Sequence, residues 1–156
     1  MSTLQTLSSR FAPARRTIAH LLRDGAERHG NRPLLTIDGR TWTHAEMVVQ
    51  VAGRAATLAA QGIATGDAVA ILCRNRLEIL ESVLACAWLG AVAVPINVAS
   101  RAPQVQYFLS NSGARLLLAE TGLGEALVDV DWSVTQVEAL WWLPEDDIPA
   151  PALPGF

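Results

Sequence analysis

The sequence contains no lysine, so all 12 of its basic residues are arginine. This absence excludes a Walker-type phosphate loop, a Schiff-base lysine and a Ser–Lys nucleophile pair within the chain. Charged residues are also scarce, at 17%, and the net charge of −3 argues against a nucleic-acid partner, which requires a basic patch. Hydrophobic residues make up 51% of the 156 residues, enough for one domain with a buried core.

Only two cysteines are present, Cys73 and Cys86, and both lie in apolar segments. Their spacing matches neither a zinc site nor a CxxC redox pair, so we expect buried free thiols in a reducing cytoplasm. The three histidines, His20, His29 and His44, have no cysteine or clustered carboxylate at ligand spacing. We therefore predict no metal-binding residue.

The uncharged stretch Ser82–Ser100 has the length of a membrane-spanning helix. It contains Gly90, Pro95 and Asn97, which favour a buried helix, a glycine stop and a buried strand instead. At the N-terminus, residues 1–16 contain Ser, Thr and Arg but no acid and no long apolar run. We expect a flexible N-terminal extension there.

A repeated strand–helix pattern dominates the middle of the chain. Apolar strands are predicted at 68–73, 91–96 and 115–119, with starts 23 and 24 residues apart. Helices are predicted between them over 76–89, capped by Asn75, and over 103–112. This order predicts an α/β fold with a βαβαβ parallel sheet and right-handed crossovers, and the continuously apolar strands predict burial on both faces.

Further elements are predicted on both sides of this repeat. Before it, two amphipathic helices flank a β-hairpin whose turn is Asp38-Gly39, and Thr43 with Glu46 forms a capping box. After it come a helix, a fourth strand and a proline-rich acidic loop or linker. The predicted bounds are 17–29 and 43–61 for the two helices, 34–42 for the hairpin, 123–137 for the later helix, 138–143 for the strand and 144–156 for the loop.

The segment Gly122-Leu123-Gly124 is the best candidate for a phosphate-binding turn, because it follows a predicted strand and opens a predicted helix. A dinucleotide fingerprint requires a third small residue, where this chain has Leu127, and should follow the first strand of the unit. We therefore interpret the segment as a helix-entry turn. No cofactor-binding residue is predicted in this chain.

No residue is singled out as a nucleophile, base or other catalytic group. Glu78 and Glu81 share one helix face, which we interpret as a solvated edge. Trp141 and Trp142 are adjacent in a predicted strand, so one indole should lie on each face. Because such a strand leaves apolar side chains and an edge exposed, we expect the chain to associate with itself or with a missing partner.

Two segments resemble core motifs of the adenylate-forming, AMP-binding superfamily. Thr41–Met47 resembles its first motif, an aromatic-rich Leu-Thr-Tyr-x-Glu-Leu, and Ala87–Asn97 resembles its second, which ends in Val-Pro-Ile/Leu-Asn/Asp. Segments similar to the rest of the family's N-terminal region are Thr17–His29, Asn31–Pro33, Gly66–Ala70 and Leu109–Arg115. Residues 17–143 thus resemble the N-terminal α/β subdomain of an ATP-dependent acyl-CoA synthetase, with Pro95–Asn97 and Arg101 similar to the carnitine/crotonobetaine and medium-chain types.

The resemblance implies an AMP-forming ligase reaction in the full-length enzyme. Members use ATP and Mg²⁺ to convert a carboxylate, such as a fatty acid, into an acyl-adenylate, and a thiol, usually CoA, then takes the acyl group. The family uses a phosphate loop ending in Pro-Lys-Gly, an adenine-binding segment, a ribose-binding Asp and a lysine on a mobile C-terminal domain. None of these is found in residues 1–156, so no catalytic, cofactor-binding or metal residue is assigned.

Two interpretations remain open. In the first, the chain is the N-terminal portion of an acyl-CoA ligase, an incomplete adenylate-forming fold whose partner is the remainder of the enzyme. The sequence would then end just before the phosphate loop, and the chain alone would be inactive and would bind neither ATP, Mg²⁺ nor CoA. In the second, it is a stand-alone, non-catalytic nucleotide- or protein-binding α/β module.

Overall fold

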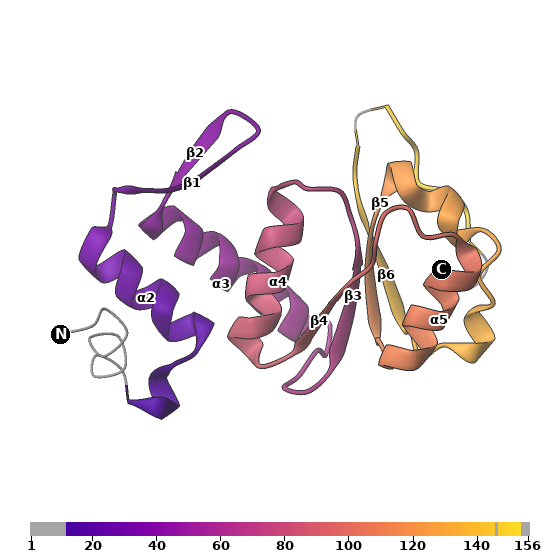
Figure 1. Ribbon diagram of the computed structural model, residues 1–156, viewed down its shortest axis with the longest axis horizontal. Coiled ribbons are helices and arrows are strands. Elements are labelled where there is room, and N and C mark those ends of the chain that lie inside the picture. The colour runs from indigo at the N-terminus through magenta and orange to yellow at the C-terminus, as the bar shows by residue number, and fades with distance from the viewer. Residues whose placement is uncertain (1–11, 146, 154–156) are drawn as a thin grey trace.

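The computed structural model describes residues 12–145 and 147–153, which form an α/β fold (Figure 1). Four parallel strands make the main sheet, in the order β4-β3-β5-β6. Their bounds are Ala68–Leu72 for β3, Val92–Pro95 for β4, Leu116–Glu120 for β5 and Ala139–Leu143 for β6. The predicted parallel βαβαβ core and its fourth strand are confirmed.

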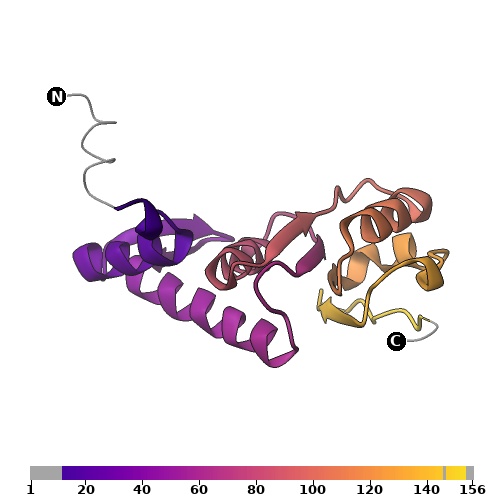
Figure 2. The same ribbon diagram turned by 90° about the horizontal axis from the view of Figure 1, so that it is seen from below.

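Helices cover both faces of this sheet. One face carries α4 (Leu77–Leu89), with α3 (His44–Ala60) and α2 (Ile18–His29) packed beyond it. The other face carries α5 (Ala102–Ser112) and two short 3₁₀ helices, η2 (Thr121–Leu127) and η3 (Trp132–Val134). Figures 1 and 2 show this succession of layers along the long axis of the molecule. The helices predicted over 17–29, 43–61, 76–89 and 103–112 are therefore confirmed within one residue at each end.

The two inner strands form the centre of the hydrophobic core. Every residue of β3 and β5 is buried, and alternate side chains point into two clusters, one on each face. The edge strand β4 differs, because Val92 is 51% exposed. Burial on both faces was predicted for all the apolar strands, and it is wrong for β4 because this strand is the edge of the sheet that the described residues form.

A separate hairpin of β1 (Pro33–Ile37) and β2 (Arg40–Thr43) lies at the end of the molecule away from α5 (Figure 1). Its turn residues Asp38 and Gly39 have φ of 50° and 74°, as a two-residue type I′ turn requires. Trp42 from β2 is 5% exposed and joins the core cluster that contains α3 and α4. The predicted hairpin at the margin of the core is confirmed.

The capping box at the start of α3 is also confirmed. The Thr43 backbone N–H donates to Glu46 Oε2 at 2.8 Å, and the Glu46 backbone N–H donates to Thr43 Oγ1 at 3.2 Å. Both bonds satisfy amide groups that have no partner within the helix. The Thr43 backbone N–H and the Thr43 hydroxyl both donate to the Glu46 carboxylate and hold the pKa of that carboxyl below its ordinary value.

Two predictions about helices are wrong. The long helix over 123–137 is replaced by η2 and η3, because the Asp131 side chain accepts a hydrogen bond from the Ser133 backbone N–H and starts a new short turn. In addition, Arg76 rather than Asn75 is the N-cap residue of α4, and it makes no side-chain capping bond. Its guanidinium binds Glu78 instead.

Arg115 ties together three segments at the amino end of the sheet. Its guanidinium donates to Asp67 before β3 at 2.8 Å and binds Glu138 before β6 through two hydrogen bonds of 3.1 and 2.7 Å. A further bond reaches the Gly62 carbonyl oxygen at 3.2 Å. These bonds fix the starts of three parallel strands relative to one another.

Near its two ends, the described part of the chain contains one short turn and a loop. Of the predicted flexible extension over 1–16, residues 1–11 lie outside the described residues, and Pro13–Arg15 form a single 3₁₀ turn. The loop predicted over 144–156 is described up to Leu153 except for residue 146, and Leu153 is buried in the core cluster beneath α5. Within the described part of the chain, no helix is long and apolar enough to cross a membrane.

The capping box gives a direct test of helix α3. We expect Thr43→Ala to lower the free energy of unfolding by about 1 kcal/mol, because the Glu46 amide loses its acceptor. Urea unfolding followed by circular dichroism measures the change. Thr57→Ala is the matched control, since the Thr57 hydroxyl only donates to the Gly53 carbonyl oxygen within the same helix. Equal losses in both variants would contradict the role of the cap.

Candidate functional site at the carboxyl end of the sheet

Two charged side chains meet where β3 and β5 end. The Arg74 backbone N–H donates to Glu120 Oε2 at 2.8 Å, and Arg74 Nη1 donates to Glu120 Oε1 at 2.9 Å. From here the chain leaves β3 toward β4 and leaves β5 toward β6, so the two connections diverge. Ligands of open α/β sheets bind at such a divergence, and this end of the sheet is therefore the candidate site.

Glu120 is only 3% exposed, yet the pKa of its carboxyl is lowered. Burial by itself raises the pKa of its carboxyl, but the backbone and side-chain hydrogen bonds from Arg74 outweigh burial and hold the pKa below 4.5. The Arg74 side chain is 48% exposed, so it keeps part of its contact with water. The pair therefore joins the two inner strands without burying both charges.

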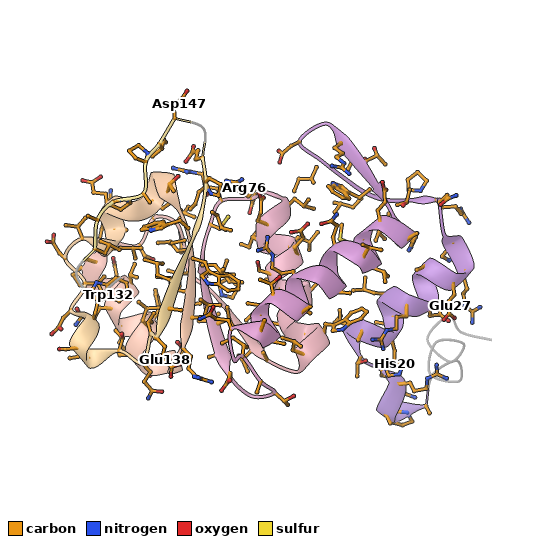
Figure 3. All side chains as sticks on the ribbon, turned by 180° about the vertical axis from the view of Figure 1, so that it is seen from behind. His20, Glu27, Arg76, Trp132, Glu138 and Asp147 are labelled. Atoms are coloured by element: carbon orange, nitrogen blue, oxygen red, sulfur yellow. The ribbon has the colours of Figure 1, made fainter. Side chains whose placement is uncertain are left out.

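The segment that follows β6 covers part of this end. Glu145 accepts a hydrogen bond from Arg74 Nη1 at 3.1 Å, and its own backbone N–H donates to the Thr121 hydroxyl at 3.0 Å. Arg76 Nη1 donates to the Pro144 carbonyl oxygen at 3.0 Å. Figure 3 labels Arg76 and Asp147, which lie at this end of the molecule. The arginines here are thus already bound by groups of the same chain.

The glycine turn Gly122-Leu123-Gly124 lies against that segment. A Cβ atom at position 122 would collide with the Glu145 carboxylate, and one at 124 would collide with the Pro151 ring. At position 124 the rigid proline ring leaves no room for a side chain, whereas at position 122 the contact is with the end of the Glu145 side chain, which is free to turn away. The packing therefore accounts for Gly124 without a phosphate, and the absence of a cofactor-binding residue stays a prediction.

An open groove of about 600 Å³ lies beside Arg74, at the carboxyl ends of β3 and β4. Its lining combines apolar side chains with two amides and one guanidinium: Cys73, Arg74, Asn75, Ile79, Pro95, Ile96, Asn97 and Val98. Such a lining suits a ligand that is apolar at one end and hydrogen-bonding at the other. None of these side chains was predicted to bind a ligand.

The cysteines and histidines form no reactive cluster in the described residues, where no group of three or more metal-ligating side chains is found. Cys73 and Cys86 are free and buried, as predicted. The rings of His29 and His44 lie 5.1 Å apart between α2 and α3, whereas His20 hydrogen-bonds to Thr17. The lack of a metal site stays a prediction.

Glu78 and Glu81 do not form the solvated edge that was predicted. Glu81 is 6% exposed and lies 3.4 Å from Arg54 Nη2 of α3, so it belongs to the contact between α3 and α4. Glu78 binds Arg76 through two hydrogen bonds of 2.8 and 2.7 Å. The prediction is wrong because α4 is covered by α3, which sequence periodicity alone does not reveal.

The indoles of Trp141 and Trp142 lie on opposite faces of β6, as predicted. Trp141 packs against the cluster that contains α3 and α4, and Trp142 packs against the cluster beneath α5. Both side chains are only partly buried. The association of the chain with itself or with a missing partner stays a prediction.

Sequence reasoning missed the ion pairs at both ends of the sheet. Arg74 and Glu120 each follow a run of apolar residues that forms an inner strand, and Arg115 precedes one. A charged side chain at the end of a buried strand is costly to bury without an opposite charge nearby. A charge in that position therefore predicts an ion pair with a neighbouring segment. The partner cannot be chosen without knowing the strand order.

A sequence model of the AMP-binding enzyme family matches residues 22–152. The match covers most of the chain and includes the four-stranded sheet, the hairpin and the carboxyl-end ion pairs. The chain therefore belongs to the AMP-binding enzyme family, and its resemblance to adenylate-forming enzymes is confirmed.

Several members of this family are similar to particular parts of the chain. The 2-succinylbenzoate–CoA ligase of Geobacillus kaustophilus is 40% identical over 112 residues, 71% of this chain and 23% of the relative. The long-chain-fatty-acid–CoA ligase FadD13 of Mycobacterium tuberculosis is 43% identical over 76 residues, 49% of this chain and 15% of the relative. A solved fatty acyl CoA synthetase of M. tuberculosis superposes with a TM-score of 0.72 at 29% identity, covering 88% of this chain and 30% of that one.

The chain thus spans less than a quarter of the length of the curated relatives that it matches. The relatives named here are ligases, which agrees with the predicted class of enzyme for the family.

The Arg74–Glu120 pair gives a pH-dependent prediction. Because the pKa of Glu120 is lower in the folded chain than its ordinary value of 4.5, the ionised carboxylate stabilises the fold above that pH. The stabilisation is lost as the pH falls through the lowered pKa. We expect Glu120→Gln to reduce the free energy of unfolding by about 1–3 kcal/mol at pH 7, and the difference from the unmodified chain to vanish in acid.

Chemical denaturation at several pH values measures this difference. The exposed Glu125 supplies the control, since Glu125→Gln should leave the stability unchanged at each pH. A Glu120→Gln variant whose deficit stays constant between pH 7 and acid contradicts the assignment.

Thiol reactivity provides a second test of the same region. Burial, with the nearby Glu120 charge, raises the pKa of Cys73 to about 12, and burial raises the pKa of Cys86 to about 11. Because the thiolate is the reactive form, we expect both thiols to react with a disulfide reagent far more slowly in the folded chain than after unfolding. A native thiol that reacts as fast as free cysteine contradicts this environment.

Proposed function

We propose that this chain is the N-terminal portion of an AMP-forming acid–thiol ligase of the acyl-CoA synthetase type. The observation that carries the proposal is the family match over 22–152, together with relatives named as CoA ligases. In the complete enzyme a carboxylate and ATP give an acyl-adenylate and pyrophosphate, and CoA then accepts the acyl group. A fatty acid is one substrate class that suits the relatives' names.

The role of these 156 residues in that enzyme is to form a scaffold rather than to supply reacting groups. The sequence contains no lysine, and Arg74 and Arg76 at the carboxyl end are held by Glu120, Glu145 and Glu78. ATP, Mg²⁺ and CoA would be held by the rest of the ligase, which is the chain's partner. The two free cysteines support a cytoplasmic location, since thiols stay reduced there.

The groove beside Arg74 is the part of the chain that would border the ligand cleft of the complete enzyme. It lies outside the carboxyl ends of β3 and β4, on the side of the sheet where open α/β folds bind their ligands. Its apolar lining of Ile79, Ile96 and Val98 suits the neighbourhood of an acyl group. The groove is open, so other parts of the enzyme would have to close it.

The chain alone is expected to be inactive. Purified chain, incubated with Mg²⁺, ATP and a fatty or aromatic acid, should release no pyrophosphate above the level of buffer, because neither a phosphate loop nor a lysine is present. The G. kaustophilus 2-succinylbenzoate–CoA ligase with its own substrate serves as a positive control for the assay. Acid-dependent pyrophosphate release by the chain alone would overturn the scaffold role.

The assignment to a longer ligase is tested separately by reading the gene beyond the codon for Phe156. A Ser/Thr/Gly-rich segment ending in Pro-Lys-Gly, in the same frame, is the expected result. A stop codon there, combined with a saturable rise in melting temperature on addition of Mg²⁺ and ATP, would instead favour a stand-alone nucleotide-binding module.

A further inference from the structure

The two edge strands of the sheet, β4 and β6, differ in how open their outer backbone groups are to pairing with another strand. Backbone groups of successive residues in a strand point to opposite sides, and the Val92 and Ile96 amides donate to Asp67 and Ile71 next to or within β3. The outward positions of β4 are therefore Ala93 and Pro95. Because proline has no N–H, Pro95 removes a donor from the outer side of β4, which is how natural edge strands are protected from pairing.

Within Ala139–Leu143 the outer side of β6 contains no proline, and the nearest one, Pro144, follows the strand. The Ala139 N–H donates to the Arg115 carbonyl oxygen, and Ala139 and Trp141 lie in register with Leu116 and Leu118. The backbone groups of the odd-numbered residues of β6 therefore face β5. Leu140 and Trp142 then direct their N–H and C=O groups outward. Within the described residues no strand pairs with this side of β6, and these outward groups make no backbone hydrogen bond there.

The surroundings of this edge favour an apolar, uncharged partner. Residues 139–143 read Ala-Leu-Trp-Trp-Leu, without a charge, and both indoles are only partly buried. The acids that flank the strand are bound within the chain: Glu138 by Arg115 and Glu145 by Arg74. In Figure 3, the strand that rises from the labelled Glu138 toward Asp147 lies at the front of the molecule, with no other ribbon before it.

We propose that β6 pairs in antiparallel fashion with β6 of a second copy of this chain, forming a continuous sheet across a two-fold axis. The segment is self-complementary: Leu140 and Trp142 of one copy exchange backbone hydrogen bonds with Trp142 and Leu140 of the other. Trp141 then lies opposite Trp141 of the second copy, on the face that carries α3 and α4. The flanking Glu138 lies opposite an uncharged Pro144, so like charges do not meet. This pairing does not depend on any ligase activity.

Single-residue variants at the two edges test the pairing. Leu140→Pro removes an outward N–H from β6, and Ala93→Pro is the matched control that removes the outward N–H of β4. We expect the unmodified chain and Ala93→Pro to be dimers by sedimentation velocity, and Leu140→Pro to be a monomer with a native circular dichroism spectrum. A monomeric unmodified chain, or a dimer lost in Ala93→Pro but kept in Leu140→Pro, would overturn the proposal.

Hydrogen exchange tests the same pairing in the unmodified chain, so this test does not require either proline variant to fold. The Leu140 and Trp142 amides should be protected at high protein concentration and lose that protection on dilution, while the β3 amides are unaffected. Protection of Leu140 and Trp142 that is independent of concentration would mean that the edge is covered within one polypeptide, and would also overturn the proposal.

Discussion

Burial of β3 and β5 on both faces is the constraint on which the rest of the structure depends. Because no side chain of these strands reaches water, the groups that specify register have to lie at the strand ends. Arg115 joins the segments that precede β3, β5 and β6, and Arg74 with Glu120 joins β3 to β5 at the opposite end. The buried apolar side chains of β3 and β5 stabilise the sheet, and the ion pairs at the ends of the strands select the order in which the strands pair.

The same division supports the scaffold role that we propose for the chain within a longer ligase. The charges at the carboxyl end are paired with one another, and the glycine turn after β5 is filled by Glu145 and Pro151 of the same chain. The groove beside Arg74 offers apolar side chains and amides but no group poised to act as a nucleophile or base. A scaffold that shapes one wall of a ligand cleft, while other segments carry the reacting groups, fits this chemistry.

Local signals in the sequence predicted most of the fold. The Asp38-Gly39 turn, the Thr43–Glu46 cap and the spacing of apolar runs each depend on neighbouring residues, and all three are confirmed. The failures depend on distant residues: Asp131 restarts the chain as a short turn beside Gln106 of α5, and Glu81 is buried only because α3 covers it. The Arg74–Glu120 pair escaped prediction for the same reason, since its partners lie 46 residues apart.

Native-state hydrogen exchange tests the two-sided burial of the inner strands most directly. If the fold depends on β3 and β5, the amides of Val69–Leu72 and Leu117–Ala119 exchange only through global unfolding and respond to denaturant as the whole chain does. The amides of the β1–β2 hairpin and of α2 should exchange through smaller openings. If the hairpin or α2 proves the slowest region, or the β3 amides exchange by local opening, the inner strands are not the constraint that holds the fold together.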